Sequence, residues 1–328
     1  MTTPTPTSIL YHADCLDGFG AAYAAWRRFG SAARYWPMHH GAPWEMSEIA
    51  GHTVYILDFS FPPETLERMA KLAHAVIQID HHASACQAWA DKLQPADDGS
   101  YTFHAPSLPL SIIFDLGKSG TRLAWEYFHE APVPLALAHI EDQDLWRFAL
   151  PATRPFCRAL RLLPFELTTW DAMVQATATP DTPRYLEMLG NGQAIEQFFQ
   201  KEVERLANGA LPSPARLRGE PVDAMQATRH GLPIISDNEL SWRAIAGIAI
   251  NTSALFSSEL GHQLAQQSGT FGLIWQLAAD GEAKVSLRSE GGFDVAEIAS
   301  RYGGGGHRNA AGFRMPVAHF MAEVLGFS

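Results

Sequence analysis

The 328-residue chain is predicted to be an α/β protein with two domains, on three observations. In its first half, short apolar runs alternate with segments of helical periodicity, which is typical of a mostly parallel sheet flanked by helices. The composition, 47% hydrophobic and 18% charged, allows a substantial core. A stretch at 208–214, with one Gly and two Pro, precedes a second, smaller pattern of strands and helices. We therefore expect a larger N-terminal domain at 1–208 and a smaller mixed-sheet α/β domain at 209–328.

The first half contains four predicted strands and four predicted helices before a longer helical region. The strands are at Ser8–Tyr11, Val54–Leu57, Ala75–Ile79 and Ser111–Phe114, and the helices are at Gly18–Phe29, 62–74, Gly120–His129 and Leu135–Leu145. In the first of these helices Phe19, Tyr23 and Trp26 recur at helical spacing, and Gly30 supplies a C-terminal stop. Helical patterns continue to about residue 207.

The second half is predicted to hold three strands and two helices that lead into a glycine run. The strands are at Ile245–Ile250, Phe271–Leu277 and Ala283–Leu287, and the helices are at Ala254–Gln267 and Val295–Tyr302. The run GGGGHR follows at 303–308. Glycines let consecutive backbone amides turn inward as an anion-binding nest, although a lone glycine run is more often a flexible turn. We expect the following residues to bind phosphate: Gly304, Gly305, Gly306, His307 and Arg308.

Charge and cysteine usage exclude several classes of protein. The 24 Lys and Arg against 35 Asp and Glu leave a net charge of −11, which works against a grip on long duplex nucleic acid, because that affinity comes mostly from phosphate neutralisation. Cys15, Cys86 and Cys157 form no CxxC pair, so neither a zinc ribbon nor a disulfide framework is indicated. The first residues lack a signal-peptide pattern, and no apolar run reaches about 18 residues. We therefore expect a cytoplasmic protein without a membrane segment.

Polar residues of metal-ligand type follow three successive predicted strands. They are His12, Asp14 and Asp17, then Asp58, then Asp80, His81 and His82. The carboxyl ends of parallel strands meet at one sheet edge, and mixed carboxylate and imidazole donors suit manganese or magnesium. A two-metal site bridged by Asp58 is the economical interpretation, although any single one of these residues could instead cap a helix or loop. His39 and His40 lack a matching carboxylate and are predicted to be surface or loop residues.

Four segments resemble one known family. They are HADCLDGFGAA at 12–22, ILDFS at 56–60, IDHHAS at 79–84 and GGGGHRNAAGF at 303–313. In this order they resemble the DHH phosphoesterase superfamily, with its RecJ-like and oligoribonuclease-like members, together with the small glycine-rich C-terminal domain that commonly accompanies it. The resemblance implies manganese-dependent hydrolysis of phosphoesters or phosphoanhydrides, including exonuclease and polyphosphatase activities. It also implies an active site in the cleft between two domains.

The resemblance implies a role for each matching residue. His12, Asp17 and His81 would ligate metal, Asp58 would bridge, Asp80 and His82 would flank the site, and Arg288 would face the substrate. His82 would bond a substrate phosphate or transfer a proton. A further aspartate is needed from the sequence IEDQDLW, where we favour Asp144 over Asp142.

The first motif departs from the family pattern. Family members usually carry two aspartates separated by one residue before the glycine, whereas this chain has Asp14, Cys15, Leu16 and Asp17. Cys15 falls where the first aspartate is usual. Either Asp14 reaches the metal through an altered loop, or one metal has fewer carboxylates. We expect Cys15 to be a small buried apolar residue rather than a ligand.

These observations predict a hydrolase of short oligonucleotides or small nucleotides that uses two Mn²⁺, with Mg²⁺ or Co²⁺ as substitutes. From 284 to 314, five basic residues oppose three acidic ones, a local excess of two positive charges where an anionic substrate would bind. Two alternatives stay open. One is an exopolyphosphatase or pyrophosphatase, and the other is a nucleotide-binding regulatory protein that has lost catalysis. The expected partner is a small phosphorylated substrate rather than a membrane or a long duplex.

Overall fold

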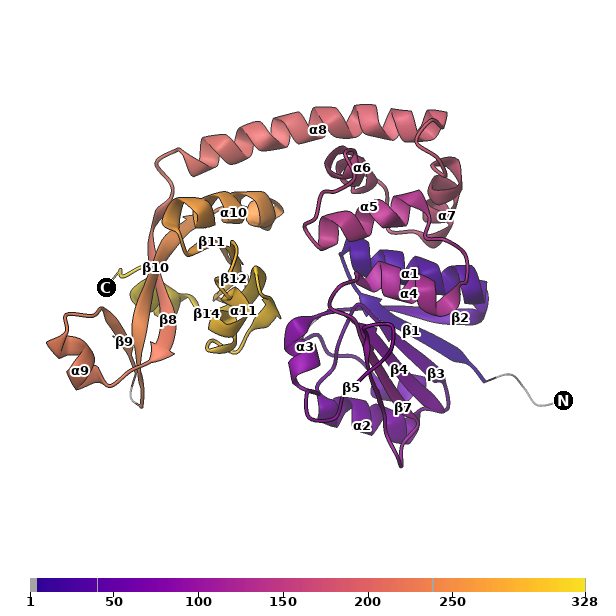
Figure 1. The fold of residues 1–328 in the computed structure, drawn as a ribbon, viewed down its shortest axis with the longest axis horizontal. Helices are drawn as coiled ribbons and strands as arrows, with labels where there is room; N and C mark the ends of the chain where they lie inside the picture. The colour runs from indigo at the N-terminus through magenta and orange to yellow at the C-terminus, as the bar shows by residue number, and fades with distance from the viewer. Residues whose placement is uncertain (1–4, 40, 238, 328) are drawn as a thin grey trace. The chain divides into compact units, whose positions relative to one another are not determined.

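The computed structural model describes residues 5–39, 41–237 and 239–327 (Figure 1). His40, predicted to be a loop residue, lies outside the described residues. The chain divides into two compact units, Met1–Gln197 (unit 1) and Phe198–Ser328 (unit 2). Both are α/β, which confirms the predicted fold class.

Unit 1 contains a seven-stranded, mostly parallel sheet. In spatial order its strands are β2 (Ala33–Met38), β1 (Thr7–His12), β3 (Thr53–Leu57), β4 (Ala75–Asp80), β7 (Leu110–Phe114), β6 (Tyr101–His104) and β5 (Gln94–Pro95). The first five are parallel, and β6 and β5 extend one edge in antiparallel pairing. All four strands predicted in this half lie in the parallel part.

Helices cover both faces of this sheet, as Figure 1 shows. They are α1 (Leu16–Phe29), α2 (Pro63–Leu72), α3 (Ala83–Gln87), α4 (Gly120–Phe128), α5 (Leu135–Asp144), α6 (Thr153–Leu160) and α7 (Leu167–Ala176), with short turns η1 (Gly30–Ala32) and η2 (Met46–Ile49). Side chains alternate between two cores: Ile9 and Leu57 pack with α1, α4 and α5, whereas Leu10 and Ile56 pack with α2. Burial on both faces explains why these strands are continuous apolar runs.

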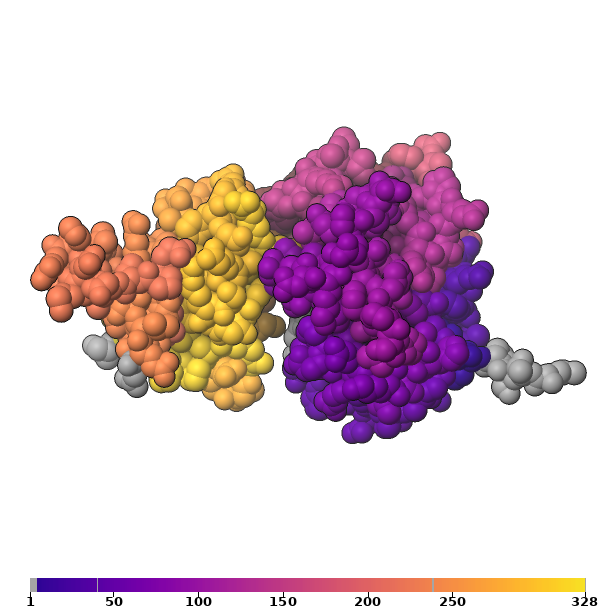
Figure 2. Space-filling model, turned by 60° about the horizontal axis from the view of Figure 1, so that its bottom comes forward, coloured from indigo at the N-terminus to yellow at the C-terminus, as the bar shows by residue number. Residues whose placement is uncertain are grey.

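Unit 2 contains a mixed sheet. Its spatial order is β13 (Gly305–His307), β14 (Ala310–Pro316), β12 (Glu282–Ser289), β11 (Phe271–Leu277), β10 (Ser241–Asn251) and β8 (Ser213–Pro221), with β9 (Ile234–Ser236) also paired to β10. Only β10 and β11 are parallel. The other elements are α9 (Ala224–Arg229), η3 (Ala254–Phe256), α10 (Ser257–Ser268), α11 (Val295–Ser300), α12 (Val317–His319) and η4 (Phe320–Val324). The segment around α9 stands out from the rest of unit 2, in orange (Figure 2).

The 25-residue helix α8 (Pro183–Ala207) crosses from one unit to the other along the chain. The sequence places the domain boundary at 208/209, at the end of this helix, whereas the two packed units divide at 197/198. In unit 2, Phe199 and Leu206 of α8 pack with Leu260 of α10. Among residues 5–39, 41–237 and 239–327, no helix has the length and apolar character needed to cross a membrane.

Candidate active site

The turn from β1 into α1 brings two expected ligands close to the sheet edge. His12 ends β1, and Asp17 lies in the first turn of α1, with its side chain 1% exposed. Gly18 makes this turn possible, because a Cβ there would collide with the carbonyl oxygen of His12. The close return of α1 onto the end of β1 therefore requires glycine at this position.

The N-terminus of α4 holds the Asp17 carboxylate. Asp17 Oδ2 accepts a hydrogen bond from Gly120 N at 2.6 Å, and Oδ1 accepts one from Thr121 N at 2.9 Å. The hydroxyl of Thr121 donates to the backbone oxygen of Asp17 at 2.7 Å. These amides would have no partner within α4, and the positive end of the helix dipole favours an anion there. Asp17 is thus fixed in position by a second element.

Asp58 follows β3 in a left-handed backbone conformation, with φ 52°. Such a conformation costs on the order of 1–3 kcal/mol for a residue other than glycine, and it concentrates at functional sites. Gly120 packs against this side chain so closely that a Cβ on Gly120 would lie 2.7 Å from Asp58 Oδ1. Asp58 is therefore held where only a glycine neighbour fits.

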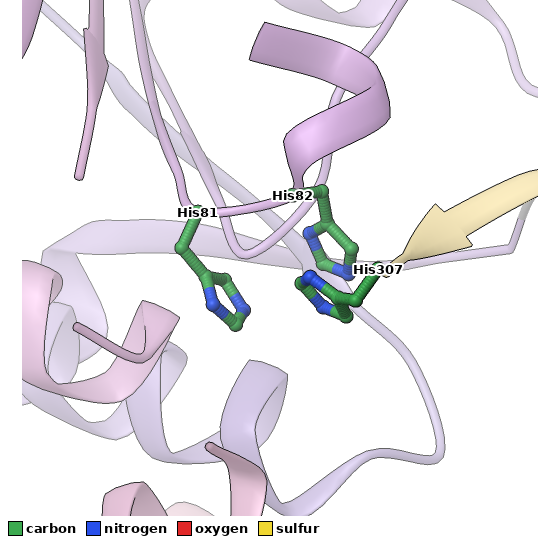
Figure 3. A group of neighbouring side chains, drawn as sticks. All are labelled: His81, His82 and His307. Atoms are coloured by element: carbon green, nitrogen blue, oxygen red, sulfur yellow. The ribbon is translucent and has the colours of Figure 1, made fainter. Parts of the chain in front are cut away.

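His81 lies among three acidic residues, of which Asp17 and Asp58 are buried and Asp144 is partly exposed. Its Nε2 is 3.1 Å from Asp58 Oδ1, 3.5 Å from Asp17 Oδ2 and 3.6 Å from Asp144 Oδ2, and Asp58 Oδ2 is 3.5 Å from His12 Nδ1. Figure 3 shows His81 and His82 as neighbours on the loop between β4 and α3. We call His12, Asp17, Asp58, His81 and Asp144 the ligand cluster; it joins the ends of three strands and of α5.

The electrostatics of the ligand cluster favour a cation. Burial, followed by the charges of Asp144 and Asp58, raises the pKa of Asp17 well above its usual range, and burial also raises the pKa of Asp144. Burial alone would lower the pKa of His81, but its bond to Asp58 and the Asp144 charge raise it to about 10. Three carboxylates this close need positive charge among them. A divalent cation in this donor set would replace protons.

Asp80 anchors the histidines that follow it. Its Oδ1 accepts a hydrogen bond from His81 N at 2.8 Å and lies 2.7 Å from His82 Nδ1, while Ser60 donates to Oδ2 at 2.5 Å. Burial opposes the charge on His82, but the Asp80 carboxylate raises the pKa of His82 to about 9. Asp80 is fully buried. Its contacts suit a residue that orients His82.

Asp142 and Asp144 have different surroundings. Asp142 accepts hydrogen bonds from Ala149 N at 2.8 Å, from Leu150 N at 3.0 Å and from the Thr153 hydroxyl at 2.5 Å. Its carboxylate is thus occupied by the loop after α5 and by the start of α6. The geometry brings Asp144 to His81 and leaves Asp142, the second choice from sequence, as a loop anchor.

Asp14 lies apart from the ligand cluster. It has φ 55°, its side chain is 83% exposed, and its Oδ2 is 3.9 Å from His39 Nε2. Among the groups of possible metal ligands in the described residues, none includes Asp14. Cys15 is included instead, with ligand atoms of His12, Cys15 and Asp58 all within 4.8 Å of one another. Of the two explanations of the altered motif, the structure does not support a loop that carries Asp14 to the cluster.

Sequence reasoning missed the small residues that bring these segments together. Gly20 meets Thr121 so closely that a Cβ would collide with its hydroxyl, and Gly120 does the same with Asp58. Ser119 caps α4 by accepting a hydrogen bond from Arg122 N at 3.2 Å. The sequence Ser-Gly-Thr at 119–121 could have revealed this contact. Ser119 is a typical N-cap of a helix, and the glycine after it leaves room for the side chain of Asp58.

The expected phosphate-binding residues lie at the β12–α10 face and in the β13–β14 hairpin of unit 2. Arg288 donates to Leu287 O at 2.8 Å and to the Ser258 hydroxyl at 3.1 Å, and burial lowers its pKa to about 10. Arg308 is exposed and donates to Gly292 O at 2.8 Å. His307 ends β13.

The glycine run has a different form from the expected nest. Gly304 N donates to Ala299 O at 2.9 Å and so helps to end α11, while Gly305 and Gly306 pair with Gly312 and Ala311 in the hairpin. The Gly304 amide is therefore committed within the fold. These glycines allow close strand approach, since a Cβ on Gly306 would lie 2.5 Å from Ala310 O.

Comparisons with known proteins give matches along most of the chain. Residues 254–326 match the family model of the DHHA1 domain. The chain is 26% identical over 326 residues to an uncharacterized protein of Acanthamoeba polyphaga mimivirus, covering 93% of this chain and 66% of that protein. It is 28% identical over 272 residues to oligoribonuclease NrnB of Bacillus subtilis, covering 79% of this chain and 58% of that protein. The chain thus spans 66% and 58% of the lengths of these relatives.

Structural comparison found several solved structures, including the following two. One is RecJ in complex with Mn²⁺ from Thermus thermophilus, at 16% identity and TM-score 0.44, covering 97% of this chain and 50% of RecJ. The other is the pGpG-specific phosphodiesterase PggH from Vibrio cholerae, at 12% identity and TM-score 0.40, covering 96% and 94% of the two chains. Because residues 254–326 match the DHHA1 domain and the chain is similar in sequence to an oligoribonuclease, the comparisons agree with the resemblance of the Asp80-His81-His82 tripeptide to the DHH phosphoesterase superfamily.

Proposed function

We propose that the chain is a metal-dependent phosphohydrolase that cleaves phosphodiester or phosphoanhydride bonds of short oligonucleotides or small nucleotides. One observation carries this proposal: the ligand cluster places three carboxylates around the His81 imidazole and the His12 imidazole beside Asp58, with oxygen–nitrogen distances of 3.1–3.6 Å. Two buried carboxylates, Asp17 and Asp58, held beside the more exposed Asp144, are costly for folding unless they serve a cation. Similarity to oligoribonuclease NrnB supports the substrate class.

The residues of the ligand cluster fit two divalent cations, with Mn²⁺ as the proposed pair and Mg²⁺ or Co²⁺ as substitutes. The carboxylates and imidazoles of the ligand cluster suit manganese. Asp58 is the proposed bridge, because its two oxygens lie near different imidazoles, at 3.1 Å from His81 Nε2 and 3.5 Å from His12 Nδ1. Bound cations would activate water and neutralise charge on the phosphoryl group.

The remaining roles belong to residues of this chain. His82, oriented through Nδ1 by Asp80, would hold or transfer a proton at Nε2. Its side chain is 24% exposed, so solvent and substrate can reach it. Arg288, His307 and Arg308 would contact substrate phosphate. The net charge of −11 favours short substrates over long duplexes.

The test is turnover of a substrate panel with added Mn²⁺. The panel holds ribo- and deoxyribodinucleotides, cyclic dinucleotides, 3′,5′-bisphosphorylated adenosine and polyphosphate, each also offered to Asp58→Ala. The proposal expects hydrolysis of a nucleotide class that the substitution abolishes. Loss of Mn²⁺ binding in the variant, measured by calorimetry, would tie the activity to the cluster. Turnover that persists in Asp58→Ala would overturn the proposal.

The same substrate panel also tests the two alternative functions. Preference for tripolyphosphate over a dinucleotide would identify an exopolyphosphatase. A nucleotide-binding regulatory protein is favoured by one observation, the position of Asp14 outside the ligand cluster. Tight nucleotide binding without turnover at saturating Mn²⁺ would support that function and reject hydrolysis.

A further inference from the structure

The start of α1 brings a thiol to a place where the fold offers metal ligands. The Nδ1 or Nε2 of His12, the Sγ of Cys15 and a carboxylate oxygen of Asp58 all lie within 4.8 Å of one another. Two donors on one cation are at most about 4.6 Å apart when each bond is about 2.3 Å. These three atoms are thus close to the separations that a shared cation requires.

Cys15 differs from the other two cysteines in what surrounds it. Cys157 belongs to the core formed with α1, α4 and α5, and Cys86 packs against the opposite core. Within the part of the chain that the structure describes, none of the four hydrophobic clusters includes Cys15. Cys15, expected to be a small buried apolar residue, is half-buried beside His12 and Asp58.

The backbone explains why residue 15, and not residue 14, joins the site. Asp14 has φ 55°, whereas Cys15 is extended, with φ −121° and ψ 137°, and it serves as the N-cap of α1. Its carbonyl accepts a hydrogen bond from Phe19 N at 3.0 Å.

We infer that Cys15 Sγ is a ligand of the cation held by His12 and Asp58. This inference rests on the proposed metal site and specifies its chemistry: one position has mixed nitrogen, sulfur and oxygen donors. On binding, the S–H bond breaks, the sulfur keeps the electron pair and donates it to the cation, and the proton passes to solvent. Thiolate donors select borderline cations such as Zn²⁺ and Co²⁺ over Mg²⁺. This chain therefore prefers such cations at the His12–Cys15–Asp58 position.

Cobalt titration of the full chain tests the inference without relying on activity. The wild type is titrated with Co²⁺ and followed by absorption for the near-ultraviolet band of sulfur-to-cobalt charge transfer. Cys15→Ser removes the thiol, Cys15→Asp offers a carboxylate on a residue type that caps helices well, and Cys86→Ser is the matched cysteine control. Circular dichroism checks that each variant is folded, and calorimetry measures bound cation.

We expect the band in the wild type and in Cys86→Ser, and its loss in both Cys15 variants while Co²⁺ still binds. The ratio of Zn²⁺ to Mg²⁺ affinity should fall by about tenfold or more in Cys15→Asp, the scale on which changes around a metal alter affinity. Persistence of the band in Cys15→Ser, or bound Co²⁺ without a band in the wild type, would overturn the inference and leave the proposed function standing. If the wild type binds no cation, both fail together.

Discussion

Two aspartates that lie two residues apart in α5 contact different parts of unit 1. Asp144 lies 3.6 Å from His81 Nε2, whereas Asp142 accepts three hydrogen bonds from the loop after α5 and the start of α6. We predict that Asp144→Asn weakens cation binding at least tenfold and removes turnover, with little change in the melting temperature. Asp142→Asn should lower stability by about 1–3 kcal/mol, because an amide nitrogen replaces one acceptor facing backbone N–H groups.

Calorimetry with Mn²⁺ and denaturant unfolding of both variants check this prediction. Each variant is the control for the other, since both make the same chemical change in one helix. The assignment of Asp144 as the ligand is wrong if Asp142→Asn loses cation binding while it keeps wild-type stability.

At the residue scale, the strand-end positions of the ligands were predictable from sequence, and the choice among neighbours was not. His12, Asp58 and His81 each end or directly follow an apolar run, so parallel pairing brings them to one edge, and Asp17 joins them from the first turn of α1. The exposed position of Asp14 goes with its left-handed backbone, φ 55°. The spacing of residues in the motif does not encode this backbone conformation.

At the scale of elements, the N-terminus of α4 must approach β3 closely for the ligand cluster to form. A Cβ on Gly120 would lie 2.7 Å from Asp58 Oδ1 and so push the helix away from Asp58 and Asp17. We predict that Gly120→Ala reduces turnover and Mn²⁺ affinity by at least tenfold, measured by activity and calorimetry. The control is Gly190→Ala in α8, where a Cβ meets nothing within 4 Å. There the change should raise stability by about 0.5–1 kcal/mol through helix propensity, and equal effects of the two substitutions would contradict the argument.

The contact of α5 with α6 and α8 predicts a dependence of stability on pH. His139 of α5 is 2% exposed, its Nδ1 lies 3.0 Å from the Thr153 hydroxyl, and its Nε2 lies 2.9 Å from the Tyr185 hydroxyl. Burial lowers the pKa of His139 to about 4 from an ordinary 6.5. The unfolded chain therefore takes up a proton on this residue before the folded chain does, and the stability that the neutral imidazole contributes is lost as pH falls from 6.5 toward 4.

Between pH 7 and pH 5 this loss should be on the order of 1–2 kcal/mol. His81 and His82 have raised pKa values and act in the opposite sense, so the measurement is the difference between the wild type and His139→Gln. Urea unfolding at both pH values should show a wild-type stability that falls relative to the variant. A difference that stays constant with pH would show that His139 takes a proton in the folded state as readily as in the unfolded one.

Strands with a clear run of apolar residues could be predicted from the sequence. Strands that form only by pairing with a neighbouring strand could not. The strands β1, β3, β4 and β7 are apolar runs buried on both faces, whereas β2 is an edge strand with the mixed sequence ARYWPM. The glycine run forms strand β13 only because β14 pairs with it. Pairing of this kind depends on residues elsewhere in the chain, so neither segment has a pattern of its own.

For the whole molecule, the sequence predicted two α/β units and placed their boundary after α8. The stretch at 208–214 has the turn residues of a boundary, whereas α8 continues as a helix through 197/198 even though Gly190 and Gly192 lie within it. The C-terminal part of α8 nevertheless packs into unit 2, where Phe199, Val203 and Leu206 are 2–6% exposed. Because α8 is one continuous helix, the boundary between the units follows from which core its side chains pack into, and the residues at the boundary do not mark it.

This packing predicts that the two boundaries give fragments of different stability. A fragment of residues 198–328 keeps the α8 side chains that cover Leu260 and Leu264 of α10, whereas a fragment of residues 209–328 exposes both to water. Each buried Phe, Val or Leu contributes about 1.5–3 kcal/mol, so the shorter fragment should be less stable by several kcal/mol and prone to aggregation. Urea unfolding and size-exclusion chromatography of both fragments measure this. Equal stability of the two would mean that α8 adds nothing to unit 2 and that the boundary lies at 208/209, as the turn residues alone indicate.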